Sequence, residues 1–320
     1  MNKKSFNALF LVVSLFAIDA NAASMAYSIN SDSGNIDAAD SLYLIDLTTG
    51  IGQLRGKLIS GFGVKLDTEG LAISPDGTLW GIDDDSLMLF PINTKNGAIG
   101  IQDEVSLTGF PAGGGNDFGM TFGCDNSLYI TSVRTRTLYR LSLDGNSEVI
   151  GTVGALGQNI SATAAFSNPT LLYGLGNGTF EDGSTDSPNL YSIDVNTGIA
   201  TMIGPLGAEA SDYDQAGLAF DGEGTLWAIT DRRTINDKKA ANLPSEILRI
   251  DIETGTATLV WTTTEIGFES LAIAPPAACS TGNAGGDFYP IIPTLSSAGR
   301  LLIVFIFLLA GMSVLRQRHA

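Results

Sequence analysis

The chain has 320 residues, with 17 Lys and Arg against 34 Asp and Glu, two cysteines and one histidine, His319. Because that histidine stands at the C-terminal end, the rest of the chain is predicted to lack Ser-His-Asp triads, Cys-His pairs and histidine-ligated zinc. A net charge of −17 also argues against nucleic acid as a partner, since an acidic surface repels the phosphate backbone.

The first 22 residues have the pattern of a secretory signal peptide. Lys3 and Lys4 form a positive n-region, LFLVVSLFAI follows as an apolar core, and Ala20 and Ala22 belong to an A-x-A cleavage site. We therefore expect recognition by signal peptidase, cleavage after Ala22 and export of the remaining chain.

The part of the chain between its two ends is strongly acidic. Residues 23–299 carry 12 basic and 33 acidic side chains, a net charge of −21. Such a surface attracts divalent cations or keeps an exported protein soluble and monomeric, and the sequence leaves both alternatives open.

One sequence element returns along most of the chain. Its copies read EGLAISPDGTLWGID from Glu69, FGMTFGCDNSLYITS from Phe118, ATAAFSNPTLLYGLG from Ala162 and AGLAFDGEGTLWAIT from Ala216, with a half-copy, ESLAIAPP, from Glu269. Equivalent positions in the five copies are Gly70, Gly119, Thr163, Gly217 and Ser270, at spacings of 49, 44, 54 and 53 residues.

A second element alternates with the first. It reads SLYLIDLTTGIGQL from Ser41, LMLFPINTKNGAIGI from Leu87, TLYRLSLDGNSEVI from Thr137, NLYSIDVNTGIATMI from Asn189 and EILRIDIETGTATLV from Glu246. Apolar and polar residues that alternate with period two, interrupted by Gly, Asn and Asp turns, indicate antiparallel hairpins. Two hairpins per repeat predict the four-stranded blade of a β-propeller.

The repeat count predicts an all-β, five-bladed propeller over residues 23–275. The strand from Ser270 to Ala274 is expected to complete the blade begun near the N-terminus, which closes the ring and removes free sheet edges. Six blades remain the alternative, if a degenerate blade lies at Ile101–Phe118 or Ala208–Gln215. The repeated glycines, aspartates and aromatic residues are explained by what blades need. The phrases SPDGTLW and DIETGTAT resemble the degenerate propeller repeats of bacterial surface proteins.

Carboxylates and an amide are predicted at the starts of the innermost strands, where loops converge on the propeller axis. Glu69, Asp117, Gln215 and Glu269 hold these places, and the third repeat departs from the pattern with Ser161. Three roles remain open for them. They can bind Ca²⁺ through oxygen ligands, Glu69, Asp117 and Glu269 can act as acid and base on a glycoside, or the side chains can cap the blade entrances.

Three further features lie in loops. Asp83, Asp84 and Asp85 form an acidic turn. A basic loop contains Arg232, Arg233, Lys238 and Lys239. It is either a contact for an anionic glycan or a partner protein, or simply a solvated loop. Cys124 and Cys279 are expected to lie on the opposite face and to form a disulfide, in a compartment that permits it.

After the propeller, residues 276–291 are a Gly/Pro-rich linker, and residues 292–320 contain Ile292-Pro293-Thr294-Leu295, an apolar stretch and terminal arginines. The apolar stretch predicts a transmembrane helix at about 300–315, with its basic end inside. The order of these parts resembles the IPTL-CTERM sorting signals of Gram-negative bacteria, relatives of the tails that exosortases process. The usual acidic residue and Trp before Gly299 are replaced by Ser297 and Ala298. The resemblance implies insertion into the inner membrane, processing by an exosortase-like enzyme, and transfer to the cell surface or release.

Together these features predict an exported, non-catalytic propeller that acts at the cell envelope as a binding or structural module, with a glycan or an envelope protein as its ligand. The alternative is a hydrolase, either a glycosidase or a metal-dependent lactonase-like enzyme, that uses the axial carboxylates Glu69, Asp117 and Glu269. Carboxylates bonded to backbone groups would favour the first, and carboxyl pairs in an open funnel would favour the second.

Overall fold

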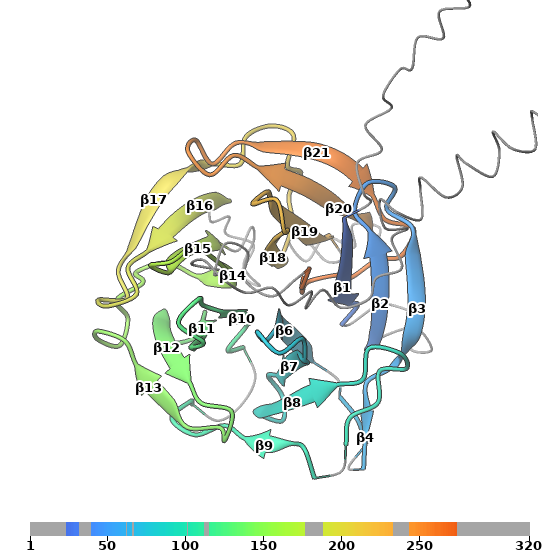
Figure 1. Ribbon diagram of the computed structural model, residues 1–320. Coiled ribbons are helices and arrows are strands. Elements are labelled where there is room, and N and C mark those ends of the chain that lie inside the picture. The colour runs from blue at the N-terminus through green and yellow to red at the C-terminus, as the bar shows by residue number, and fades with distance from the viewer. Residues whose placement is uncertain are drawn as a thin grey trace, which may run out of the picture.

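The computed structural model describes residues 24–31, 40–61, 63–65, 67–100, 102–111, 115–176, 188–232 and 243–273. These residues form strands and turns, without a helix, and the strands are arranged as a ring of small sheets around one axis (Figure 1). No helix in this part of the chain is long and apolar enough to cross a membrane. The expected signal peptide, linker and C-terminal helix lie outside the described residues.

Five sheets make up the ring, and in blades 2 to 5 the strands run from innermost to outermost in chain order. Blade 1 contains β1 (Met25–Ile29), β2 (Ser41–Asp46) and β3 (Gly52–Lys57). Blade 2 contains β6 (Thr68–Ile73), β7 (Leu79–Asp83), β8 (Met88–Ile92) and β9 (Val105–Ser106). Blade 3 contains β10 (Phe118–Phe122), β11 (Leu128–Ser132), β12 (Thr137–Leu141) and β13 (Ser147–Val149). Blade 4 contains β14 (Ile160–Phe166), β15 (Leu171–Gly176), β16 (Asn189–Ile193) and β17 (Ala200–Pro205). Blade 5 contains β18 (Ala216–Phe220), β19 (Leu226–Arg232), β20 (Leu243–Ile250) and β21 (Ala257–Thr262).

The ring closes through the two ends of the propeller sequence. Tyr27 of β1 pairs antiparallel with Ala272, through hydrogen bonds of 2.7 and 2.9 Å between their backbone groups. The backbone N–H of Ile29 and the hydroxyl of Ser28 add bonds to Ser270, at 3.1 and 2.5 Å. The segment around Ala272 therefore supplies the innermost strand of blade 1, as the sequence predicts.

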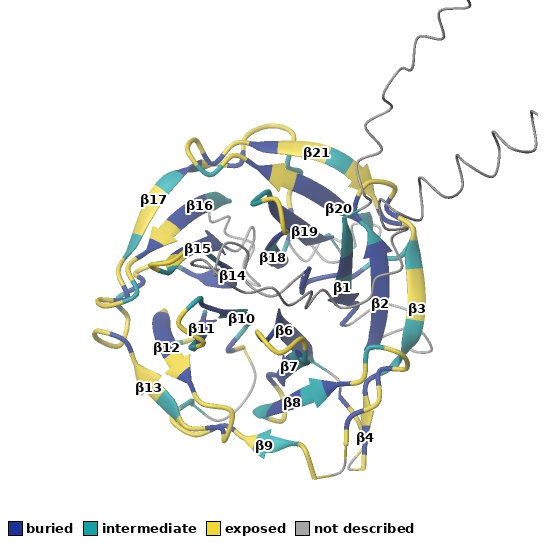
Figure 2. Ribbon diagram, in the orientation of Figure 1, coloured by how far each residue is buried: buried dark blue, intermediate teal, exposed yellow. Residues whose placement is uncertain are grey.

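Apolar side chains fill each junction between consecutive blades. Five clusters of buried residues occur, and each contains strands of two neighbouring blades. The cluster between blades 5 and 1, for example, joins Trp227 and Ile229 to Tyr43 and Ile45. The inner strands are buried on both faces between neighbouring blades. The residues of the outermost strands β3, β13, β17 and β21 are more exposed (Figure 2).

The equivalent glycines of the repeat lie where innermost strands approach one another. A Cβ atom on Gly119 would lie 2.9 Å from the backbone of Ala162 and Thr163 in blade 4. A Cβ atom on Gly217 would lie 2.3 Å from the carbonyl carbon of Ser270 in blade 1. Glycine is thus required at these two positions because the innermost strands pack closely around the axis, and no ligand is needed to explain it.

The turns of the Asp-x-x-Thr-Gly kind fasten each blade to the one before it. In blade 5, Oδ1 of Asp251 accepts hydrogen bonds from the backbone N–H groups of Glu253 and Thr254, and Gly255 then adopts a φ of +79°. A Cβ atom on Gly255 would lie 2.4 Å from the carbonyl oxygen of Gly204 in blade 4. Gly50, at the ring closure, lies equally close to Thr262. The motif is therefore explained by blade packing.

Three details differ from the sequence predictions. Neither Ile101–Phe118 nor Ala208–Gln215 forms a sixth blade. The described part of the first range supplies β9, the outer strand of blade 2, and the first residue of β10, and the second range contains no strand. A small hairpin, β4 (Ile59–Ser60) and β5 (Gly63–Val64), follows β3 and is too short to show alternation. Glu69 lies inside β6 and not before it.

Candidate functional site

Glu69 projects from a β-bulge in the innermost strand of blade 2. Thr68 pairs with Asp83 and Gly70 with Ile82, so Glu69 is the extra residue, without a partner in the ladder of β7. A bulge redirects one side chain while the strand continues. The sequence placed Glu69 before the strand, and the alternation pattern gave no sign of the bulge that includes it.

The carboxylate of Glu69 connects three blades. Its Oε2 accepts a 2.8 Å hydrogen bond from the backbone N–H of Phe118 in blade 3, and its Oε1 accepts one of 3.2 Å from Nε2 of Gln215 beside blade 5. Only 5% of Glu69 is exposed. The predicted meeting of Glu69 and Gln215 near the axis is therefore observed, as an internal hydrogen bond.

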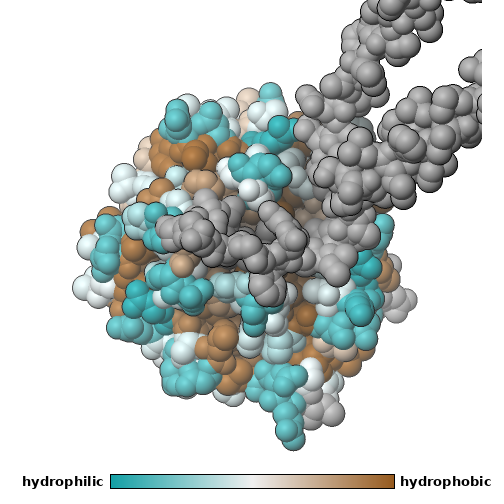
Figure 3. Space-filling model, in the orientation of Figure 1, coloured by the Kyte–Doolittle hydropathy of each residue, from teal (hydrophilic) through white to brown (hydrophobic). Residues whose placement is uncertain are grey.

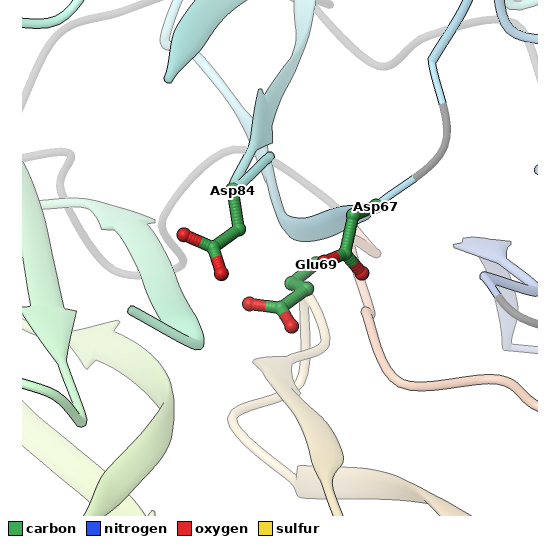
Figure 4. Close-up of side chains that lie close together, drawn as sticks. All are labelled: Asp67, Glu69 and Asp84. Carbon is green, nitrogen blue, oxygen red and sulfur yellow. The ribbon is translucent and has the colours of Figure 1, made fainter. Parts of the chain in front are cut away.

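Two aspartates that the sequence did not single out as axial ligands lie beside Glu69. Asp67 immediately precedes β6, and Asp84 begins the turn after β7. The backbone N–H of Asp84 donates a 2.9 Å hydrogen bond to the carbonyl oxygen of Asp67. One carboxylate oxygen from each of Asp67, Glu69 and Asp84 lies within 4.8 Å of the others, and the three side chains point toward a common space (Figure 4). We call these three residues the acidic cluster.

Asp84 is fixed by blade 3. Its Oδ2 accepts hydrogen bonds of 2.6 and 3.0 Å from the backbone N–H groups of Gly115 and Asn116, in the loop that enters β10. Its side chain is fully buried, and Oδ1 has no hydrogen-bond partner among the described residues. The backbone of the glycine-rich loop FPAGGGNDFG thus binds the Asp84 carboxylate through Gly115 and Asn116.

Burial and mutual repulsion disfavour the charged forms of Glu69 and Asp67. Burial, followed by the negative charges of Asp117, Asp67, Glu269 and Asp84, raises the pKa of Glu69 well above its usual range. Burial is also the main cause that raises the pKa of Asp67 to about 8, with contributions first from Glu269 and then from Asp84. The site would therefore gain free energy from a proton or from a cation.

The remaining predicted residues surround the acidic cluster. Asp117 precedes β10 and has a φ of +39°, a backbone conformation that residues other than glycine rarely adopt. Glu269 precedes the segment around Ala272 in blade 1, and only 3% of it is exposed. Ser161 occupies a bulge in β14. The axial entrance predicted from the sequence is therefore assembled from all five blades, with Asp67 and Asp84 as the members that were missed.

The axis itself is almost closed. The hollow between Glu69, Ser161 and Glu269 at this end has a volume of about 10 Å³, and the hollow at the other end has about 30 Å³. A cavity of this size holds one or two water molecules. No sugar ring fits between the innermost strands.

A larger cleft lies beside the acidic cluster. Its volume is about 460 Å³, within the range that binds small ligands. Residues from the β4–β5 hairpin, the β7–β8 turn and the segment before β9 line it: Val64, Lys65, Asp83, Asp85, Ser86, Met88 and Glu104. Lys65 is buried and forms an ion pair with Glu104, so its charge is neutralised within the protein. We call this the hairpin cleft.

Other predicted residues have structural surroundings. Asp83 caps the acidic turn by accepting hydrogen bonds at Oδ1 from the backbone N–H and the hydroxyl of Ser86. Arg232, from the predicted basic loop, pairs with Glu246 at 3.0 Å, and Arg233, Lys238 and Lys239 lie outside the described residues.

Cys124 lies in the turn between β10 and β11, at the far end of the axis from the acidic cluster. It is disulfide-bonded. Its expected partner, Cys279, lies outside the described residues, and their pairing stays a prediction.

No family model matches the chain, and no curated protein matches it. Among solved structures it is similar to a catalytically inactive virginiamycin B lyase from Staphylococcus aureus with quinupristin, at 19% identity and a TM-score of 0.41, over 75% of this chain and 71% of that one. A protein of unknown function from Bacteroides caccae is similar at 10% identity and a TM-score of 0.49, over 78% and 98% of the two chains. Likeness at this level assigns no activity to the chain.

Proposed function

We propose that this propeller is an exported binding module of the cell envelope, without catalytic activity, whose ligand site is the hairpin cleft. One observation carries the proposal. Glu69 and Asp84, the buried carboxylates of the axial entrance, accept hydrogen bonds from backbone N–H groups of the next blade and are not presented to an open funnel. Carboxylates held in this way join blades and shape the entrance.

The glycosidase form of the hydrolase alternative lacks support in the same region. A general acid or base must come within hydrogen-bond reach of the substrate. Both oxygens of Glu69 are already hydrogen-bonded within the protein, and the hollow beside Glu69 and Glu269 has only about 10 Å³. A glycoside therefore has no route to this pair through the described residues.

The hairpin cleft offers the features that recognition requires. Val64 and Met88 provide apolar surface, and Asp85 and Ser86 provide exposed polar groups. Because Lys65 is paired with Glu104 while Asp85 presents an exposed carboxyl side chain, the cleft suits a hydroxyl-rich ligand that is neutral or cationic. A neutral or amine-bearing envelope glycan has this chemistry.

The two ends of the sequence support the proposed location. The signal peptide would direct export, and the IPTL-type tail would hold the chain in the inner membrane until an exosortase-like enzyme transfers it to the surface or releases it. The net charge of −21 for residues 23–299 is consistent with a soluble surface module.

An array of bacterial envelope glycans tests the binding role. We expect the protein to bind neutral or amine-bearing glycans, and Val64→Trp to abolish that binding by filling the cleft from an exposed position on β5. Leu143→Trp, at an equally exposed apolar residue of blade 3, is the control and should bind as the unaltered protein does. Release of shortened glycans, seen by mass spectrometry, would contradict the non-catalytic role. Unchanged binding by Val64→Trp would contradict the cleft.

A further inference from the structure

The acidic cluster is a group of three carboxylates, two of them buried and Asp67 half-buried, drawn from two neighbouring segments of one blade. Asp67 and Asp84 are brought opposite each other by the pairing of β6 with β7, and the bulge directs Glu69 toward both. The ligand oxygens lie within 4.8 Å of one another, which is about twice the 2.3–2.6 Å bond length of Ca²⁺ to oxygen. One ion can therefore touch all three.

A second observation, independent of the clustering, points to a ligand in this space. Asp84 is fully buried and held by two backbone N–H groups through Oδ2, while its Oδ1 has no hydrogen-bond donor among the described residues. Figure 4 shows the Asp84 carboxylate directed toward Glu69. A buried carboxylate oxygen without a partner costs free energy that a bound cation would recover.

No basic side chain neutralises the cluster within the described part of the chain. Ion pairs in that part of the chain include those of Lys65 with Glu104, Arg140 with Glu148 and Arg232 with Glu246, none of which involves Asp67, Glu69 or Asp84. Lys65 precedes Asp67 closely in the chain, but its ammonium group contacts Glu104 and the hydroxyl of Ser86 instead. Glu269 adds another negative charge near Asp67 and Glu69. Negative charge therefore accumulates around Asp67 and Glu69.

We infer that Asp67, Glu69 and Asp84 form a Ca²⁺ site at the entrance of the propeller axis. Oxygen ligands from carboxylates match the preference of Ca²⁺, and ligands from loop, bulge and turn allow its flexible geometry, whereas Mg²⁺ demands a near-ideal octahedron. The site rests on the proposed function in one respect, because an exported chain is the one that meets extracellular Ca²⁺. The ion would also hold the β7–β8 turn in place, and this turn lines the neighbouring hairpin cleft.

The ligand set differs from the one that the sequence suggested. Glu69 is shared by both sets. Gln215 donates its amide N–H to Glu69 and so supports a ligand rather than serving as one. Asp117 and Glu269 lie near enough to act on the charge of Glu69, and we place them around the ion rather than on it.

Titration calorimetry and thermal unfolding test the site on the full chain after removal of metals with a chelator. We expect CaCl₂ to bind and to raise the Tm at constant ionic strength, because a ligand that binds only the folded state stabilises it. Asp84→Asn keeps an oxygen acceptor for Gly115 and Asn116, and should weaken Ca²⁺ binding at least about tenfold. Glu253→Gln removes the same charge from an exposed turn of blade 5 and should leave binding unchanged.

Three results would overturn the inference: no heat and no Tm shift with millimolar CaCl₂, an equal effect of KCl at matched ionic strength, or equal weakening by Glu253→Gln. If Asp84→Asn fails to fold, Asp67→Asn replaces it, since Asp67 is only half-buried. Glycan binding is measured separately with the chelated protein, and export by intact mass, so failure of the ion site is distinguishable from failure of the proposed function.

Discussion

The backbone N–H of Phe118 donates a 2.8 Å hydrogen bond to Oε2 of Glu69 across the junction of blades 2 and 3. A carboxylate from a bulge thus satisfies the first donor of the next innermost strand. Such a bond is made where water is excluded, so removing the acceptor leaves a buried N–H unsatisfied. The entrance carboxylates therefore have a structural role even before any ligand binds.

Replacing Glu69 separates this role from its charge. We expect Glu69→Ala to lower the free energy of unfolding by about 1–3 kcal/mol, since Phe118 loses its acceptor. Glu69→Gln keeps an acceptor oxygen and should cost less in the absence of Ca²⁺. Urea denaturation of both variants measures the difference, with Glu253→Ala as an exposed control. Equal losses for Ala and Gln would show that the hydrogen bond is not what matters.

Stability without Ca²⁺ should depend on pH through Asp67. Burial and neighbouring carboxylates raise its folded-state pKa to about 8, whereas the unfolded value is about 3.9. The folded protein keeps a proton that the unfolded chain releases, so this stabilisation is complete below about pH 4 and is lost as the pH rises toward 8. Asp67→Asn should flatten the decline of the Tm across that window, measured in chelator. A decline as steep as that of the unaltered protein would contradict the shifted pKa.

The blade-to-blade turn contacts predict a difference between two glycines. Gly77 and Gly255 both have a positive φ, of +87° and +79°, but a Cβ atom on Gly77 meets nothing within 4 Å, whereas one on Gly255 would lie 2.4 Å from the oxygen of Gly204. We expect Gly77→Ala to cost about 1 kcal/mol from backbone strain alone, and Gly255→Ala clearly more. Urea denaturation measures the loss in the free energy of unfolding for each variant. Equal losses would mean that the close contact of Gly255 with Gly204 in blade 4 does not limit the side chain at this position.

The cysteines should be paired in the folded protein. Cys124 is disulfide-bonded, and Cys279 is the only other cysteine of the sequence. We expect no reactive thiol under denaturing, non-reducing conditions, and a lower Tm after reduction. In the chain-entropy model, closing so long a loop stabilises the fold by about 4–5 kcal/mol. Two reactive thiols in the unreduced protein would rule the bond out.

The blade count could be predicted from the sequence because each innermost strand repeats a required set of residues. Gly119 and Gly217 recur where neighbouring backbones leave no room for a Cβ atom, and this constraint makes the repeat visible. The ring closure followed from the half-copy at Glu269 and is confirmed by the pairing of Ala272 with Tyr27. The β4–β5 hairpin was missed, because two-residue strands show no alternation.

The site could be predicted only in part. Glu69 and Gln215 were identified by their places before the repeated strands, and they do meet. Asp67 and Asp84 were missed because their closeness depends on the register of β6 with β7. That register pairs Thr68 with Asp83, which places the residues on either side of this pair opposite each other. Counting outward from the Asp-Gly turn at Asp76 and Gly77 would have placed Asp84 opposite Thr68, because the bulge at Glu69 shifts the register by one residue. The bulge at Glu69 has no comparable signal.

Intact-mass analysis of the protein recovered from the cell envelope and the medium tests the central claim, an exported surface module, most directly. We predict a chain that begins at Ala23 and ends near Pro293, as removal of both the signal peptide and the sorting tail requires. A chain that begins at Ala23 but runs to Ala320 would support export and contradict removal of the tail. A chain from Met1 to Ala320, confined to the cytoplasm, would contradict the account.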